Sequence, residues 1–230
     1  MELLWEVCSL SGEVMKYAIF DVDGTLIDSM KMWRNVGAVF LESHGYPPLK
    51  YHKKTSNDTW EHDFLREVKE QLNIDVTYEE FFKWFSDYVI GQYSCHLPLK
   101  NGAYSLLQKL KADGVKMCVC TSTHRFMMQP ALDRLGLNDF FEFTCHCNEF
   151  GKEKNCPDIF IHCMEKLGAE NPGDVVVFED AFYSASTAKS AGFHLVGIYD
   201  DTEHRNLEMQ KICDQYISGF SELDFSKLPE

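Results

Sequence analysis

Two aspartates that directly follow a short apolar run are the residues of this sequence best placed to do chemistry. The run is Tyr17–Phe20, and it continues into Asp21-Val22-Asp23-Gly24-Thr25. A short apolar run that ends in a turn signal suits a buried strand, and side chains two positions apart on a strand point the same way. The glycine lets the backbone turn and approach a ligand closely. Both carboxylates would therefore lie at the carboxyl end of a strand, where open α/β sheets bind ligands.

Further polar residues follow two other apolar runs. Residues 115–120 continue into Thr121-Ser122-Thr123, and residues 175–178 continue into Glu179-Asp180. A polar loop ahead of Pro157-Asp158 carries Lys154, with Lys152 as the less favoured alternative. These positions matter because the carboxyl ends of parallel strands meet at one edge of a sheet.

Strands alternate with helices along most of the chain. Apolar runs are found at 17–20, 115–120, 140–145, 175–178 and 195–198, and the segments between them have helical spacing. Such alternation requires right-handed crossovers and a parallel sheet. The sequence therefore predicts an α/β fold, a Rossmann-like parallel sheet with helices on both of its faces.

One long stretch has only helical character. It begins with apolar residues at helical spacing in Met30–Ser43, and Asp58-Thr59-Trp60-Glu61 and Thr77-Tyr78-Glu79-Glu80 both resemble a capping box at the start of a helix. The expected domains are therefore an α/β core of residues 1–28 and 98–230, and an inserted all-α cap of residues 29–97. The many aromatic residues of the cap are expected to form the core of a small bundle.

The side chains gathered at the sheet edge suit phosphoryl transfer. Clustered carboxylates repel one another and need a cation, and hard oxygen ligands that leave positions for water and phosphate favour Mg²⁺. A metal, a lysine and a hydroxyl can together neutralise a transferring phosphoryl group. One aspartate can attack phosphorus, while another serves first as general acid and then as general base for water.

The bulk composition limits the partners. The 230-residue chain has a net charge of −14, so nucleic acid is not an expected partner, because binding it requires clustered Lys and Arg. No apolar run approaches the length of a membrane span, and nine scattered cysteines indicate a reduced, cytoplasmic protein. Cys145-His146-Cys147 hints at a second metal site, but no further pair stands at zinc-finger spacing. Residues 1–14 read as a loose extension, and a monomer or weak dimer is expected.

Taken together, these motifs resemble the haloacid dehalogenase superfamily, in the subfamily IA branch of β-phosphoglucomutase-like proteins and phosphatases with a helical cap. The resemblance rests on Asp21-Val22-Asp23-Gly24-Thr25, on Thr121, on Lys154 with Pro157-Asp158, and on Glu179-Asp180, all in the order of the family's motifs. It covers the chain from about Met15 to the C-terminus. It implies a Mg²⁺-dependent phosphatase that hydrolyses a small phosphorylated metabolite, such as a sugar phosphate, through an aspartyl phosphate.

The resemblance also implies residue roles. Asp21 would be the nucleophile and Asp23 the acid–base residue, while Thr121 and Lys154 would hold the phosphoryl oxygens. The remaining substrate-binding residues would be Gly24, Ser122 and Thr123. The Mg²⁺ ligands would be Asp21, the main-chain carbonyl of Asp23, Asp180, and Glu179 as a ligand or close neighbour.

The sequence departs from the family's pattern in ways that bear on the reaction. The mutases of this branch carry a cap histidine where this chain has Trp33, and their cap arginine motif has no counterpart between Leu49 and Trp60. A phosphatase is therefore favoured, with a β-phosphoglucomutase-like mutase as the alternative and a catalytically idle binding protein as a further one. Ala181 and Ser184 stand where relatives often have Ser and Gly. Four basic residues could attract an anionic substrate or could simply be solvated: Lys53, Lys54, His124 and Arg125.

Overall fold

The computed structural model describes residues 15–50 and 60–229. The expectations about residues 1–14, about Lys53 and Lys54, and about a capping box at Asp58-Thr59 fall outside these ranges. Within them, parallel strands form one sheet in the order β3-β2-β1-β4-β5-β6. The strands are β1 (Tyr17–Phe20), β2 (Lys116–Thr121), β3 (Phe143–His146), β4 (Val175–Glu179), β5 (His194–Ile198) and β6 (Gln215–Ile217).

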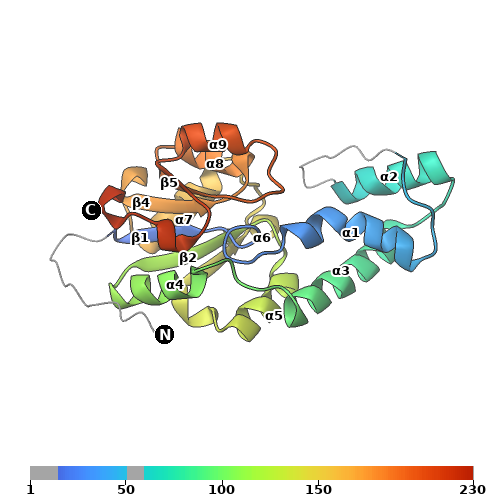
Figure 1. Cartoon of the computed structure of the whole chain (residues 1–230), viewed down its shortest axis with the longest axis horizontal. Coiled ribbons are helices and arrows are strands. Elements are labelled where there is room, and N and C mark those ends of the chain that lie inside the picture. Colours follow the sequence, from blue (N-terminus) through green and yellow to red (C-terminus); the bar gives the residue numbers. More distant parts are fainter. Residues whose placement is uncertain (1–14, 51–59, 230) are drawn as a thin grey trace.

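Helices cover both faces of the sheet, as Figure 1 shows for α4 and α5 on one side and α8 and α9 on the other. The helices of this part are α4 (Ala103–Ala112), α5 (Arg125–Leu135), α6 (Cys147–Phe150), α7 (Asp158–Leu167), α8 (Phe182–Ser190) and α9 (Asn206–Ile212). The α/β class and the Rossmann-like parallel sheet that the alternating pattern predicts are confirmed.

Both faces of the central strand β1 are covered by hydrophobic clusters, which explains why its sequence is an apolar run. Ala18 and Phe20 face the hydrophobic cluster that contains α4 and α5, whereas Ile19 faces the cluster that contains α7 and α8. All three are completely buried, as expected for a parallel strand covered on both faces. Phe20 pairs in register with Val119 of β2 and Phe178 of β4, so the residues that follow each strand emerge at one edge.

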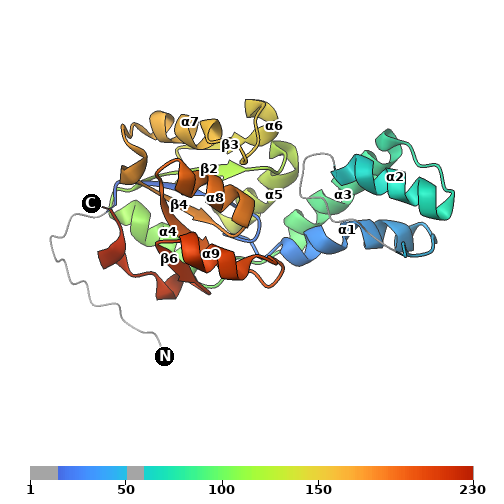
Figure 2. The same ribbon diagram turned by 90° about the horizontal axis from the view of Figure 1, so that it is seen from above.

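The first three helices after β1 lie beside the sheet rather than on it (Figure 2). They are α1 (Met30–Ser43), α2 (Trp60–Leu72) and α3 (Tyr78–Cys95). The α1 bounds match the sequence expectation, and Gly45 (φ +68°) follows its end in the left-handed conformation that favours glycine. The capping box predicted at Thr77 and Glu80 is present at the start of α3.

Aromatic rings hold these three helices together. The Phe40 ring of α1 lies 5.0 Å from that of Phe81, 5.1 Å from that of Trp84 and 6.0 Å from that of Phe64, measured between centroids, and all three contacts are edge-on. Edge-to-face pairs of this kind add stability beyond the area that they bury. The expected aromatic bundle core is therefore present, while the separate cap domain of residues 29–97 stays a prediction.

Several element bounds differ from the sequence expectation. Strands β2 and β4 include Thr121 and Glu179, because these residues pair in register with His146 and Gly197 of the next strands. The strand expected from residue 140 begins at Phe143, because Asn138–Phe140 forms a 3-10 turn. The single helical turn α6 was not expected, since four residues carry too little periodicity to be recognised. No helix among the described residues is both long and apolar enough to cross a bilayer.

Candidate active site

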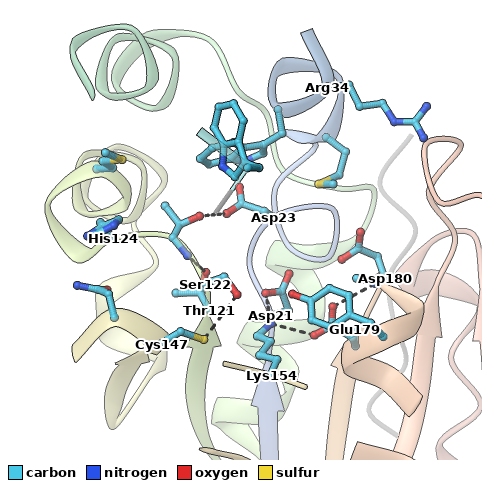
Figure 3. Close-up of a pocket in the computed structure, with 18 of the residues that line it drawn as sticks. Asp21, Asp23, Arg34, Thr121, Ser122, His124, Cys147, Lys154, Glu179 and Asp180 are labelled. Carbon is cyan, nitrogen blue, oxygen red and sulfur yellow. Dashed lines mark hydrogen bonds and ion pairs between the residues drawn. The ribbon is translucent and has the colours of Figure 1, made fainter. Parts of the chain in front are cut away.

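A cavity of about 640 Å³ lies at the carboxyl ends of the strands, between the sheet and helices α1 to α3 (Figure 3). Eight of the nine residues expected to form the site line it: Asp21, Asp23, Thr121, Ser122, Thr123, Lys154, Glu179 and Asp180. Gly24 is not among the lining residues. Its φ is +84°, and a Cβ at this position would lie 2.1 Å from Asp180 Oδ2. Close approach to Asp180 therefore explains the glycine, and its contact with substrate stays a prediction.

Lys154 joins two of the carboxylates. Its ammonium donates to Asp21 Oδ1 and, at 2.9 Å, to Glu179 Oε2. All three side chains are buried. Asp21 directly follows β1, Glu179 ends β4, and Lys154 lies in the loop ahead of α7. Lys152 instead pairs with Asp158 at an exposed position, so the structure favours Lys154 over Lys152 as the lysine of the site. Such buried charges are tolerated only when they are paired and hydrogen-bonded.

Burial dominates the electrostatics of this group. Desolvation raises the pKa of Asp21 to about 8, against the lowering effect of Lys154, and the negative charges of Glu179 and Asp23 add to the rise. Desolvation and the charges of Glu179 and Asp21 likewise hold the pKa of Asp180 well above its usual range. Desolvation opposes the charge on Lys154, but the neighbouring carboxylates outweigh it and raise the lysine pKa. Without a further cation, the burial of three carboxyl groups around one lysine therefore favours the protonated forms of Asp21 and Asp180.

The donor set fits a hard divalent cation. Asp21, Glu179 and Asp180 each offer a carboxylate oxygen, and these oxygens lie within 4.8 Å of one another; this is the metal-type group found among the described residues. Buried carboxylates with raised pKa values gain from a cation that replaces their lost hydration. The Asp23 carboxylate is not part of this group, and the expectation that Asp23 contributes its main-chain carbonyl stays a prediction. Within the described part of the chain, Cys145-His146-Cys147 does not form such a group.

Hydrogen bonds from neighbouring residues orient the carboxylates of Asp180 and Glu179. The Thr25 hydroxyl donates to Asp180 Oδ1 at 3.0 Å. The Ser184 hydroxyl donates to Glu179 Oε2 at 2.7 Å, and the main-chain N–H of Ala181 donates to Glu179 Oε1 at 3.1 Å. The two positions that depart from the family's pattern, Ala181 and Ser184, therefore both bind Glu179.

The Asp23 carboxylate has a different environment, made of hydroxyl groups. Ser29 donates to Oδ1 at 2.6 Å, Thr123 donates to Oδ2 at 2.7 Å, and the hydroxyl of Tyr93 on α3 also donates to Oδ1. Burial, together with the charge of Asp23, raises the pKa of Tyr93 well above its usual range, so this hydroxyl keeps its proton. Sequence reasoning missed Ser29 and Tyr93, because their link to Asp23 exists only in the folded chain.

The end of β2 adds further hydroxyls. The main-chain N–H of Thr123 donates to Thr121 Oγ1 at 3.1 Å, which fixes the buried Thr121 side chain at the cavity wall. Ser122 Oγ lies 3.5 Å from Cys147 Sγ. Of the basic residues expected to attract substrate or to be merely solvated, His124 lines the cavity. Arg125 instead donates two hydrogen bonds, of 2.7 and 2.8 Å, to the Glu149 carboxylate.

Helices α1 to α3 contribute mainly apolar side chains to the cavity. Trp33, Trp60 and Phe85 line it, and the Phe85 ring lies 5.9 Å from Trp33 and 5.5 Å from Trp60. Trp33 Nε1 is buried, without a hydrogen-bond partner among the described residues. Arg34 of the same helix reaches across to the core, where it donates to the carbonyl of Thr202.

Comparison with known proteins agrees with this geometry. Residues 15–192 match the profile of the haloacid dehalogenase-like hydrolases. The chain belongs to this family. Its relatives include the phosphorylated carbohydrates phosphatase of Thermotoga maritima, 28% identical over 182 residues that cover 79% of this chain and 84% of the relative. The phosphoglycolate phosphatase of Chromobacterium violaceum is 22% identical over 189 residues, covering 80% of this chain and 85% of the relative.

Solved structures of haloacid dehalogenase-like hydrolases share the fold. A structure from Thermotoga maritima, provisionally described as a β-phosphoglucomutase, is 25% identical with a TM-score of 0.71 and covers 88% of this chain and 94% of its own. The chain is thus a hydrolase of this family, as its motif order indicates. The expected polar residues line the cavity at the carboxyl ends of the strands (Figure 3). Residues of α1 to α3 line its opposite side.

Proposed function

We propose that this haloacid dehalogenase-like hydrolase is a Mg²⁺-dependent phosphatase that acts on a small phosphate monoester, such as a sugar phosphate, through an aspartyl phosphate on Asp21. The observation that carries the proposal is the placement of Asp21. Its carboxylate lies at the base of the cavity, in contact with Lys154 and beside Glu179 and Asp180. The named phosphatases among the relatives support the reaction class.

In this reaction Asp21 attacks phosphorus and the bond to the leaving oxygen breaks. Lys154 and Thr121 bind the phosphoryl oxygens, and Ser122 and Thr123 extend this hydroxyl surface along the cavity wall. Asp23 lies two residues along from the nucleophile, and its carboxylate faces the cavity. It donates a proton to the leaving oxygen and then accepts one from the water that hydrolyses the aspartyl phosphate.

The metal would be held by Asp21, Asp180 and the Asp23 carbonyl, with Glu179 as a ligand or neighbour. When bound, Mg²⁺ supplies positive charge that offsets the repulsion between the nucleophile and the phosphate. Lys154 meanwhile compensates Asp21 and Glu179 from the other side. Thr25 keeps Asp180 turned into the cavity.

We also propose that residues 29–97 act as a cap over the substrate, in a cytoplasmic enzyme that works as a monomer or weak dimer. Trp33, Trp60 and Phe85 then face the part of the substrate beyond the phosphate. Trp33 occupies the position of a cap histidine in the related mutases, and an indole can only donate a hydrogen bond. This favours water over a sugar hydroxyl as the acceptor of the phosphoryl group.

The proposal is tested with the Asp21→Asn variant, which keeps the shape of the side chain and removes the attacking carboxylate. Turnover of 4-nitrophenyl phosphate should fall by roughly 10⁴-fold or more, as expected when a nucleophile is lost, while the circular dichroism spectrum stays unchanged. Wild-type turnover should require Mg²⁺ and stop in excess chelator. Near-normal turnover by the variant would rule out the covalent route.

A second assay separates hydrolysis from transfer. The protein is given β-glucose 1-phosphate with a catalytic amount of glucose 1,6-bisphosphate, and free phosphate and glucose 6-phosphate are followed together. A phosphatase releases phosphate as the main product. Rapid formation of glucose 6-phosphate with little free phosphate would instead identify a mutase whose cap works without the histidine.

A further inference from the structure

Tyr93 connects the inserted helices to the proposed acid–base residue. It lies in the last turn of α3, its side chain is fully buried, and its hydroxyl donates to Asp23 Oδ1 although the two residues are 70 positions apart. A hydroxyl that donates to a carboxylate forms a charge-assisted bond, which is roughly twice as strong as a neutral one. A buried tyrosine hydroxyl needs a hydrogen-bond partner, and here that partner is the proposed acid–base residue rather than a main-chain carbonyl.

The hydroxyls that hold Asp23 Oδ1 come from both ends of the inserted segment. Ser29 directly precedes α1, where the chain leaves the core, and it donates to Oδ1 at 2.6 Å. Tyr93 lies near the end of α3, where the chain returns. The remaining donor, Thr123, bonds the other oxygen, Oδ2, from the loop after β2. One carboxylate oxygen is therefore held by the two connections between the helices and the core.

The returning connection is also anchored to the sheet domain. Arg134 of α5 donates from Nε to the main-chain carbonyl of Tyr93 at 2.9 Å, and from Nη2 to the carbonyl of Leu97. The main chain of Tyr93 is thus bound to the core while its side chain reaches Asp23.

We propose that Tyr93 is a positioning residue, which holds the Asp23 carboxylate for proton transfer. The inference rests on the proposed phosphatase reaction. In that reaction the proton that Asp23 gives to the leaving oxygen comes from Oδ2 and is later recovered from water. The Tyr93 proton stays on its own oxygen throughout, and its bond to Oδ1 fixes the direction of Oδ2.

The test compares two leaving groups in the Tyr93→Phe variant, which removes the hydroxyl and keeps the ring. An alkyl phosphate, glycerol 2-phosphate, needs a proton on its leaving oxygen, whereas the aryl leaving group of 4-nitrophenyl phosphate departs largely without one. We measure kcat/KM, which reports the steps up to departure of the leaving group. For the alkyl ester kcat/KM should fall roughly tenfold, the size expected for one hydrogen bond to a charged group, and for the aryl ester by no more than about twofold.

The ratio of the two kcat/KM values distinguishes positioning from a structural role. A variant that only loses folded protein lowers both values equally, so the ratio does not depend on the active fraction. Tyr88→Phe is the matched control, because Tyr88 lies on the same helix and its ring stacks on Trp84, 5.2 Å between centroids. It should leave the ratio unchanged.

Ser29→Ala removes the other donor to Oδ1 and should change the ratio in the same direction as Tyr93→Phe. A Tyr93→Phe ratio within twofold of that of the wild type would overturn the positioning role. A wild-type protein that hydrolyses neither ester would instead count against the proposed function, so the two failures are distinguishable.

Discussion

The two walls of the cavity differ in chemistry, one built mainly from charged and hydroxyl side chains and the other mainly from apolar ones. On the core wall, Asp21, Lys154 and Glu179 bury their charges against one another at the carboxyl ends of the strands. On the cap wall, Trp33 and Phe85 present apolar rings whose positions depend on helix packing. The core wall therefore suits what all phosphate esters share, and we expect the cap wall to contact the part in which they differ.

The two walls meet at Asp23, which belongs to the loop after β1 but is held partly from α3. Its neighbour Asp21 has its side chain bound to Lys154, and its main-chain N–H donates to Phe178 of β4 at 3.0 Å. The proposed nucleophile is thus held by the core, whereas the proposed acid–base residue depends on both walls. In the proposed reaction, the attack on phosphorus would therefore depend on the core alone, whereas proton transfer would also depend on Tyr93 of α3.

The largest effect is expected from changing the residue at which the walls meet. Asp23→Asn removes the proton donor and should lower kcat about 10²–10⁴-fold, the range for loss of a general acid–base residue. The loss should be smaller for 4-nitrophenyl phosphate than for an alkyl phosphate. Equal losses for both esters would mean that Asp23 acts by another route, and thermal melting should show that the variant stays folded.

The second largest effect is expected on the free energy of unfolding, when the positive charge of Lys154 is removed from the core wall. Lys154→Met leaves Asp21 and Glu179 buried without their cation, and breaking such a group typically costs about 3–5 kcal/mol. The free energy of unfolding, measured in urea with chelator present, should fall by an amount of this order, and Mg²⁺ should restore part of it. A variant as stable as the wild type in chelator would contradict the view that Lys154 compensates the cluster.

A destabilising substitution in the cap should make the cap unfold before the core. Phe40→Ala removes the ring at the centre of the aromatic contacts and should cost about 3 kcal/mol. Three of the four tryptophans, Trp33, Trp60 and Trp84, lie in α1 to α3. With Trp5 replaced by Phe in every variant, tryptophan fluorescence should therefore report unfolding of the cap at lower urea than circular dichroism does. Phe160→Ala in α7 is the matched core control, and it should move both transitions together. Coincident transitions in Phe40→Ala would show that the cap and core unfold as one unit.

The smallest expected effect is a change in folding stability with pH. Asp21 has a pKa of about 8 in the folded protein and 3.8 as its ordinary value, so the folded state keeps a proton that the unfolded state has lost. Stability in chelator should therefore fall as pH rises through this window, by about 1 kcal/mol between pH 7 and pH 8.5. Mg²⁺ or Asp21→Asn should flatten the dependence. The same slope in Asp21→Asn would assign it to another group.

Much of the site could be predicted from the sequence because its residues follow strands. Buried strands are short apolar runs, and parallel strands end at one edge, so the local pattern is enough to place Asp21, Thr121 and Glu179 together. The lysine was harder to predict, since a loop residue has no periodicity to locate it. Lys152 and Lys154 are two positions apart in the same polar loop, and only the folded loop directs Lys154 to Asp21.

The sequence by itself determined the order of the strands and helices, the α/β class and the chemical types gathered at the sheet edge, because these depend on local periodicity. Only the tertiary structure decided which hydroxyls hold Asp23, that Arg34 contacts Thr202, and that Gly24 lies against Asp180. Each of these contacts joins residues whose separation in the sequence carries no local signal. They follow from how the helices pack on the sheet, a property of the whole chain rather than of any one stretch.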